Sequence, residues 1–130
     1  EELLDIFDIK KDVVQTLVEM GVDSIHCGCW NIDFIKFLSD FKIPIQGHVG
    51  LVPMRSTWTG GVKPFGKKSN EAIKIYDNIK EIEKIGAWAV EVECVPKEVL
   101  SELTKRTKML TISIGSGSLP SPESPLANSP

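Results

Sequence analysis

Residues 87–98 read AWAVEVECVPKE and join a strand pattern directly to the start of a helix. Apolar residues dominate the first half, and Pro96 suits the first turn of a helix, where its missing N–H is not needed. Glu91 and Glu93 are two residues apart, so both lie on one face of the predicted strand 87–93. A charged group on the inner side of a strand needs a partner or a function, because burying it unpaired is costly.

The same alternation of strand and helix patterns continues on both sides of this unit. Apolar residues at helical spacing, with Asn31 and Ser69 as candidate caps and Gly21 and Gly86 as candidate stops, predict helices over 10–20, 31–41, 69–86 and 96–106. Short apolar runs predict strands over 22–28, 43–50, 87–93 and 110–117. Single helices between strands indicate an α/β fold with a parallel sheet and right-handed crossovers.

Two segments lie outside this pattern. Residues 51–68 form a loop rich in Gly, Pro and Lys, and loops of this length in compact domains are often functional. Residues 118–130 hold four prolines and four serines with few large apolar groups, which predicts a disordered tail.

Composition limits the classes of function. The chain is 42% hydrophobic and 25% charged, with a net charge of −3. It is mildly acidic and has no basic stripe, so its charge gives no reason to expect a nucleic-acid partner. No apolar run is long enough to span a bilayer, and the acidic start EELLDIFDIKKD is not a secretory signal. Cys27, Cys29 and Cys94 are an odd number in apolar surroundings, which indicates a reducing compartment, and we expect the cytoplasm. The first residue is not Met, so we expect a processed chain or a fragment.

Three blocks are more specific than the general α/β pattern. GHVGLVPMRSTWTGG (47–61), GAWAVEVECVP (86–96) and TISIGSG (111–117) resemble the conserved blocks of the ketopantoate hydroxymethyltransferase family. The resemblance covers residues 10–117 in order and spacing. It implies a (β/α)8 TIM-type barrel of which residues 1–117 form about half, with four parallel strands and their helices, followed by the tail 118–130.

The resemblance also implies a reaction. Members of this family transfer a hydroxymethyl group from 5,10-methylenetetrahydrofolate to 3-methyl-2-oxobutanoate and so make 2-dehydropantoate for pantothenate biosynthesis, with Mg²⁺ holding the keto acid. The expected partners are therefore a small 2-oxo acid and folate, not nucleic acid or a membrane. Because half a barrel exposes strand edges, we also expect a homo-oligomer or association with the missing barrel half.

Glu93 is the predicted catalytic residue. It matches the family's proton acceptor and ends a barrel strand, where active sites of this architecture gather and where partial burial favours uptake of a proton. The alternative is a solvated glutamate at a strand end. His48 matches the histidine of the G-H-x-G-L-x-P block and is a predicted substrate-binding residue, or else a histidine satisfied by nearby backbone. Glu91 stands where the family has an aliphatic residue, and we expect a structural role for it.

The first strand departs from the family. Here the sequence is SIHCGCW (24–30) instead of K-x-E-G-G, so His26 stands in place of the substrate-binding lysine and no carboxylate stands in place of the metal-site glutamate. His26 is therefore a second predicted substrate-binding residue. The remaining Mg²⁺ ligands of the family belong to strands that this chain lacks. His26, Cys27 and Cys29 could instead form a zinc or copper site, although strand alternation points Cys27 away from His26.

The loop 51–68 offers basic and aromatic groups to an anionic pterin: Arg55, Trp58, Lys63, Phe65, Lys67 and Lys68. A solvated loop with one anchoring tryptophan is the alternative. Two other functions remain open at this point. The chain could belong to another enzyme of the same barrel class that acts on 2-oxo acids through a metal enolate, or it could be a non-catalytic truncated fragment.

Overall fold

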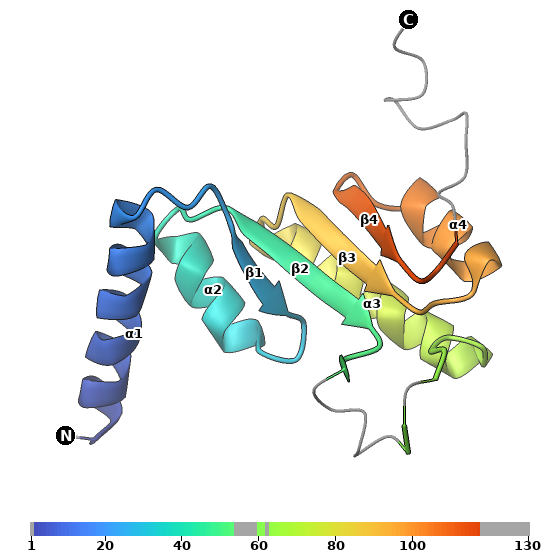
Figure 1. Ribbon diagram of the computed structural model, residues 1–130, viewed down its shortest axis with the longest axis horizontal. Coiled ribbons are helices and arrows are strands. Elements are labelled where there is room, and N and C mark those ends of the chain that lie inside the picture. Colours follow the sequence, from blue (N-terminus) through green and yellow to red (C-terminus); the bar gives the residue numbers. More distant parts are fainter. Residues whose placement is uncertain (1, 54–59, 62, 118–130) are drawn as a thin grey trace, which may run out of the picture.

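The computed structural model describes residues 2–53, 60–61 and 63–117, with side chains described from residue 10 onward. The predicted tail 118–130 lies outside the described residues, as do Arg55 and Trp58 of the loop. Within the described ranges the chain alternates helices and strands (Figure 1). The elements in chain order are α1 (Glu2–Glu19), β1 (Ile25–Gly28), α2 (Ile32–Asp40), β2 (Ile45–Gly50), α3 (Ser69–Ile85), β3 (Ala89–Glu93), α4 (Lys97–Lys105) and β4 (Leu110–Ile114).

The α/β prediction is confirmed, but several element ends differ from the predicted ones. The strands are shorter, since β1, β2 and β3 begin at Ile25, Ile45 and Ala89 and β4 ends at Ile114, and α4 begins after Pro96. Helix α1 begins at Glu2, well before the predicted start at residue 10. Helix α3 starts at Ser69 itself, so Lys68 is its cap residue and no side chain caps its first turn. At the other end of α3 the prediction is confirmed: Gly86 has a φ of 116°, the left-handed conformation that glycine adopts most easily.

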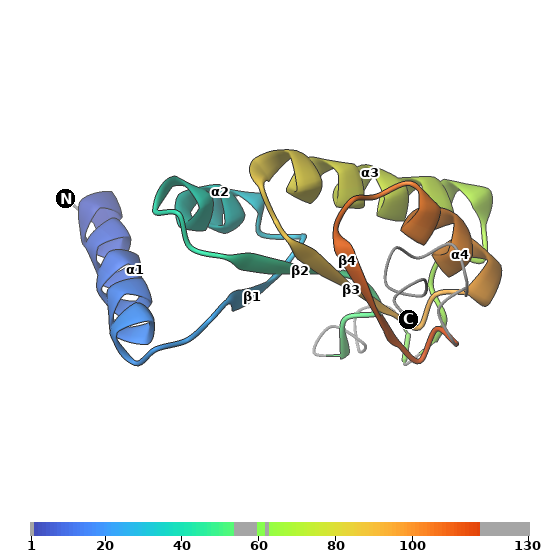
Figure 2. The ribbon, with the colours of Figure 1, turned by 90° about the horizontal axis from the view of Figure 1, so that it is seen from above.

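The strands form one parallel sheet in the order β1-β2-β3-β4, so strands that follow each other in the chain lie side by side. Helices α2, α3 and α4 all lie on one face of this sheet (Figure 2). Sequential strand order with every crossover helix on the same face is the arrangement of a (β/α) barrel wall. A doubly wound sheet would instead carry helices on both faces.

Strand alternation divides the side chains between the two faces of the sheet. Val90 and Val92 of β3 join the hydrophobic core beneath the helices, together with Ile45 and Val49 of β2. The helices contribute matching apolar residues: Ile35, Leu38, Ile75, Ile79, Ile82, Leu100 and Leu103. The opposite face of the sheet therefore receives the alternate residues of each strand, which include both glutamates of β3.

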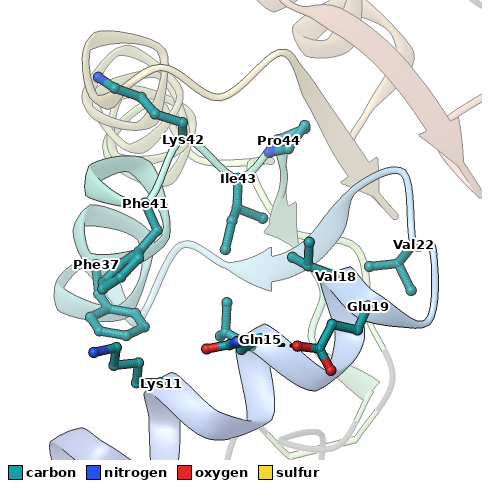
Figure 3. Close-up of a pocket in the computed structure, with 11 residues that line it drawn as sticks. Lys11, Gln15, Val18, Glu19, Val22, Phe37, Phe41, Lys42, Ile43 and Pro44 are labelled. Atoms are coloured by element: carbon teal, nitrogen blue, oxygen red, sulfur yellow. Dashed lines mark hydrogen bonds between the residues drawn. The ribbon is translucent and has the colours of Figure 1, made fainter.

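Helix α1 stands apart from the sheet, beside α2 at the β1 end of the molecule (Figure 1). A hollow of about 430 Å³ separates α1 from α2 and the segment after it (Figure 3). Its walls include the aliphatic Val14 and Val18 and the aromatic Phe37 and Phe41, so it is mainly apolar. No helix of the described residues is long and apolar enough to cross a membrane.

Candidate functional site

Polar side chains gather on the sheet face that α2, α3 and α4 leave uncovered. The register pairs His26 with Gln46 and His48 with Glu91, which places these four residues side by side across β1, β2 and β3. Gln46 and Glu91 lie within β2 and β3, whereas His48 and Glu93 extend the cluster toward the carboxyl edge of the sheet. This is the edge at which barrel enzymes and open α/β proteins carry their sites.

Glu91 is the centre of this polar cluster. One carboxylate oxygen, Oε1, accepts a hydrogen bond of 2.8 Å from the Gln46 amide. The other oxygen, Oε2, lies 3.1 Å from His26 Nε2 and 3.3 Å from His48 Nδ1. The Glu91 side chain is 20% exposed, so its charge is only partly hydrated and depends on these partners. Glu91 thus has the polar partners that a partly buried carboxylate needs, and its structural role stays a prediction.

His48 is the most buried member of the cluster, with a side chain that is 6% exposed. Its Nε2 lies 2.7 Å from the carbonyl oxygen of Leu51. A carbonyl can only accept a hydrogen bond, so Nε2 carries the proton and Nδ1 faces Glu91. The backbone carbonyl of Leu51 therefore anchors one side of the ring and the other side belongs to the polar cluster, while substrate binding by His48 stays a prediction.

Glu93 ends β3 and is not a solvated surface carboxylate. Its side chain is 16% exposed, and its Oε2 lies 3.4 Å from His48 Nε2. The backbone around it is tightly held, since Leu51 N donates to the Glu93 carbonyl and the next residue, Cys94, has a φ of 51°. A positive φ at a non-glycine residue costs energy and marks a constrained strand end. The structure thus keeps the Glu93 side chain largely buried and beside a histidine.

His26 differs from the other members because its side chain is 50% exposed. It lies on the edge strand β1 and its ring packs edge-on against His48, with ring centroids 5.5 Å apart. The exposed ring leaves one side of the cluster open to solvent. His26, His48 and Glu91 each offer one donor atom, and these three atoms lie within 4.8 Å of one another.

The three donors do not fit Mg²⁺, the ion that the family resemblance implies. Mg²⁺ binds oxygen ligands in octahedral geometry and usually keeps several waters, whereas two of these donors are imidazole nitrogens. Among the residues that the structure describes, this is the group of three or more His, Cys, Asp or Glu side chains close enough to share an ion. No step that depends on Mg²⁺ is therefore assigned to these residues.

The thiols of Cys27 and Cys29 belong to the other face of the sheet. Both side chains are buried in the hydrophobic core, and burial raises the pKa of Cys29 to about 12. A thiol must lose its proton to bind zinc or copper, so this environment opposes metal binding. The structure separates these thiols from His26, in agreement with strand alternation, and it joins His26 to His48 and Glu91 instead.

Only part of the loop 51–68 is described. Phe65 is half-buried against the hydrophobic core, and its N–H donates to the Cys94 carbonyl, which ties the loop to the end of β3. Lys63, Lys67 and Lys68 are exposed. The described part of the loop therefore has a structural anchor near Glu93 and cationic groups in solvent.

The sequence pointed to His26, His48 and Glu93 as candidate site residues, and the structure adds Gln46 and Glu91 as their neighbours. The sequence signal for Glu91 is a charged residue within an otherwise apolar strand. The sequence does not show which residues lie beside it, so this signal alone does not place Glu91 in the cluster. Gln46 lies on the same strand face as His48, two residues earlier, and this spacing alone could have placed it in the cluster. The apolar hollow beside α1 shares no residue with the cluster.

Fold and site together define a class of protein. A sequentially ordered parallel sheet with helices on one face, and polar groups at its carboxyl edge, is a barrel-type α/β protein. The family model for ketopantoate hydroxymethyltransferase matches residues 10–121. This chain belongs to that family.

Curated relatives agree with the family match. The 3-methyl-2-oxobutanoate hydroxymethyltransferase of Staphylothermus marinus is 40% identical over 103 residues, which cover 78% of this chain and 38% of the relative. That of Clostridium botulinum is 37% identical over 109 residues, which cover 82% of this chain and 40% of the relative. A probable 3-methyl-2-oxobutanoate hydroxymethyltransferase of Schizosaccharomyces pombe is 32% identical over 90 residues, 69% of this chain and 34% of the relative. The chain thus spans about two fifths of the first two relatives.

Proposed function

We propose that this chain supplies part of the active site of a hydroxymethyltransferase that moves a one-carbon unit from 5,10-methylenetetrahydrofolate to 3-methyl-2-oxobutanoate. Family membership and the relatives' names support the reaction. The observation that carries the proposal is the half-dry Glu93 carboxylate at the end of β3, 3.4 Å from His48.

Glu93 is proposed as the group that accepts a proton during formation of the new carbon–carbon bond. Carboxylates are common general bases, and Glu93 stands at the carboxyl end of β3, where barrel enzymes place their catalytic groups. His48 would position it, because the Leu51 carbonyl holds the ring and its Nε2–H faces both acceptors. His26, at the solvent-exposed side of the cluster, is proposed to contact the 2-oxo acid.

The test measures formation of 2-dehydropantoate from 3-methyl-2-oxobutanoate and 5,10-methylenetetrahydrofolate. The chain is assayed alone and together with the region of the Clostridium botulinum relative to which it does not align. We expect activity in the mixture, and we expect Glu93→Gln to lower kcat by about 10²- to 10⁴-fold, the usual contribution of a positioned general base. Glu98→Gln is the matched control, since Glu98 is exposed on α4 and lies outside the cluster.

Two results would count against this proposal. Full activity of the complemented Glu93→Gln variant would remove the role of Glu93. Absence of product in every mixture, with a folded chain, would remove the proposed reaction.

A second candidate is another 2-oxo acid enzyme of the same barrel class. The observation that favours it is the first strand, where His26 joins His48 and Glu91 in a cluster that the family pattern does not contain. Product analysis with methylenetetrahydrofolate present and absent separates the two candidates, because only hydroxymethyl transfer requires the folate. Turnover of the 2-oxo acid without folate would favour the second candidate.

A further inference from the structure

The Glu91 carboxylate lies between two imidazole rings that approach the same oxygen. Oε2 is 3.1 Å from His26 Nε2 and 3.3 Å from His48 Nδ1. These three donor atoms come from three adjacent strands, so the sheet register and not a flexible loop sets their spacing. Rigid elements hold a binding site more precisely than loops do.

The hydrogen bond from His48 to Leu51 determines which ring nitrogen faces the Glu91 carboxylate. Its Nε2–H is directed at the Leu51 carbonyl, so in the neutral ring Nδ1 is an acceptor. An unprotonated Nδ1 that faces a carboxylate oxygen at 3.3 Å brings two electron-rich atoms together in a buried place. A cation held between the two atoms would make this contact favourable.

We propose that His26 Nε2, His48 Nδ1 and Glu91 Oε2 bind a divalent transition-metal ion of the zinc type. Bonds of about 2.0–2.1 Å in a tetrahedral site place neighbouring donor atoms roughly 3.3–3.5 Å apart. Both distances from Glu91 Oε2 are close to that spacing, and all three donors lie within 4.8 Å of one another. The His26 side chain is half-exposed, so a small rotation of its ring can bring Nε2 closer to His48 Nδ1.

The surroundings of the donors have the organisation of a metal site. The second nitrogen of a metal-binding histidine usually donates to a carbonyl or carboxylate, as His48 Nε2 does to Leu51. The second oxygen of Glu91 is likewise held, by the Gln46 amide at 2.8 Å. Two histidines and one glutamate leave a fourth position for water or a substrate oxygen, the pattern of catalytic and not structural zinc sites.

This inference goes beyond the proposed function and does not depend on it. It assigns an ion to residues of this chain that do not suit Mg²⁺, at the strand where the sequence departs from the family pattern. Binding of the ion can be measured without any substrate.

The test is titration of the 130-residue chain with Zn²⁺ by calorimetry and with Co²⁺ by visible absorption. We expect one equivalent of each to bind, with a visible Co²⁺ band typical of tetrahedral nitrogen and oxygen ligands and without a thiolate charge-transfer band in the near ultraviolet. His26→Ala and Glu91→Gln should each weaken Zn²⁺ binding at least about tenfold. His26 is half-exposed, so its variant keeps the fold, which circular dichroism verifies.

Two variants serve as controls. Glu98→Gln makes the same chemical change as Glu91→Gln at an exposed position and should bind Zn²⁺ as the parent does. Cys94→Ala removes the thiol that the core does not bury and should also leave binding unchanged. Unchanged Zn²⁺ affinity in His26→Ala and Glu91→Gln would overturn the proposal. So would absence of binding to the folded parent at 100-fold molar excess of Zn²⁺.

Discussion

Gly50 is the residue at which β2 meets the proposed general base. It pairs with Glu93 in the parallel register, and its φ is +91°. A Cβ atom at this position would lie 2.2 Å from the Glu93 carbonyl oxygen, a backbone atom that cannot turn aside. The second glycine of the G-H-x-G block is therefore required by sterics, because only glycine permits this φ and this close approach.

Replacement of Gly50 tests this argument. We expect Gly50→Ala to lower the free energy of unfolding by roughly 2 kcal/mol or more, from backbone strain and the clash with Glu93. Urea unfolding followed by circular dichroism measures the change. Gly60→Ala is the matched control, because Gly60 also has a positive φ but no atom of the described residues lies within 4 Å of its added Cβ. Its expected cost is about 1 kcal/mol, and equal losses in both variants would exclude the clash as a cause.

At the scale of elements, α3 is the helix that holds the centre of the sheet in place. Its buried stripe consists of Ile75, Ile79 and Ile82. The Ile82 side chain packs directly against Gly47 of β2, so the helix and the strand approach closely. The polar cluster lies on the other face of the same strands. Packing of α3 therefore supports the strands from which Gln46, His48 and Glu91 project.

Two isoleucines of α3 allow the contribution of packing to stability to be distinguished from that of helix propensity. Ile79 is 1% exposed and Ile73 is 60% exposed, although both lie on the same helix. We expect Ile79→Ala to reduce the free energy of unfolding by about 2–5 kcal/mol, since it removes buried methyl groups and leaves a cavity. Ile73→Ala should change it by less than about 0.5 kcal/mol. Chemical denaturation measures both, and similar losses would contradict the assignment of the buried face.

At the scale of the molecule, the sheet has one covered face and two open edges. Strands β1 and β4 are the edges of the described sheet, and Leu110 and Ile114 of β4 are each about two-fifths exposed. Parallel sheets are normally covered on both faces, and open edges attract further strands. In a closed barrel the opposite strands cover the inner face and no edge remains.

Association is therefore the expected behaviour of the chain in solution. We expect sedimentation equilibrium at tens of micromolar to give a mass greater than that of one chain. Leu110→Lys and Ile114→Lys together should shift the protein toward the monomer, because they place charges along an edge strand. Ile73→Lys is the control, with an exposed apolar residue on α3, away from the edge. A monodisperse parent that melts cooperatively as a monomer would contradict this expectation.

Local patterns were sufficient to predict most of the elements. The stripe of α3, the stop at Gly86 and the strand over 87–93 were predicted because each depends on neighbours in the chain. The predicted start of the first helix at residue 10 is wrong, since α1 begins at Glu2. Ser69 was misassigned as a cap because helix ends depend on backbone geometry that a single residue type does not specify.

The amino-acid sequence on its own determined the alternation of helices and strands, the parallel sheet, the family and the choice of His26, His48 and Glu93. Those features depend on local periodicity and on motifs that can be read along the chain. Only the tertiary structure decided that Glu91 joins Gln46 and both histidines. The reason is register: pairing of three strands brings together residues more than 40 positions apart, and no local pattern contains that information.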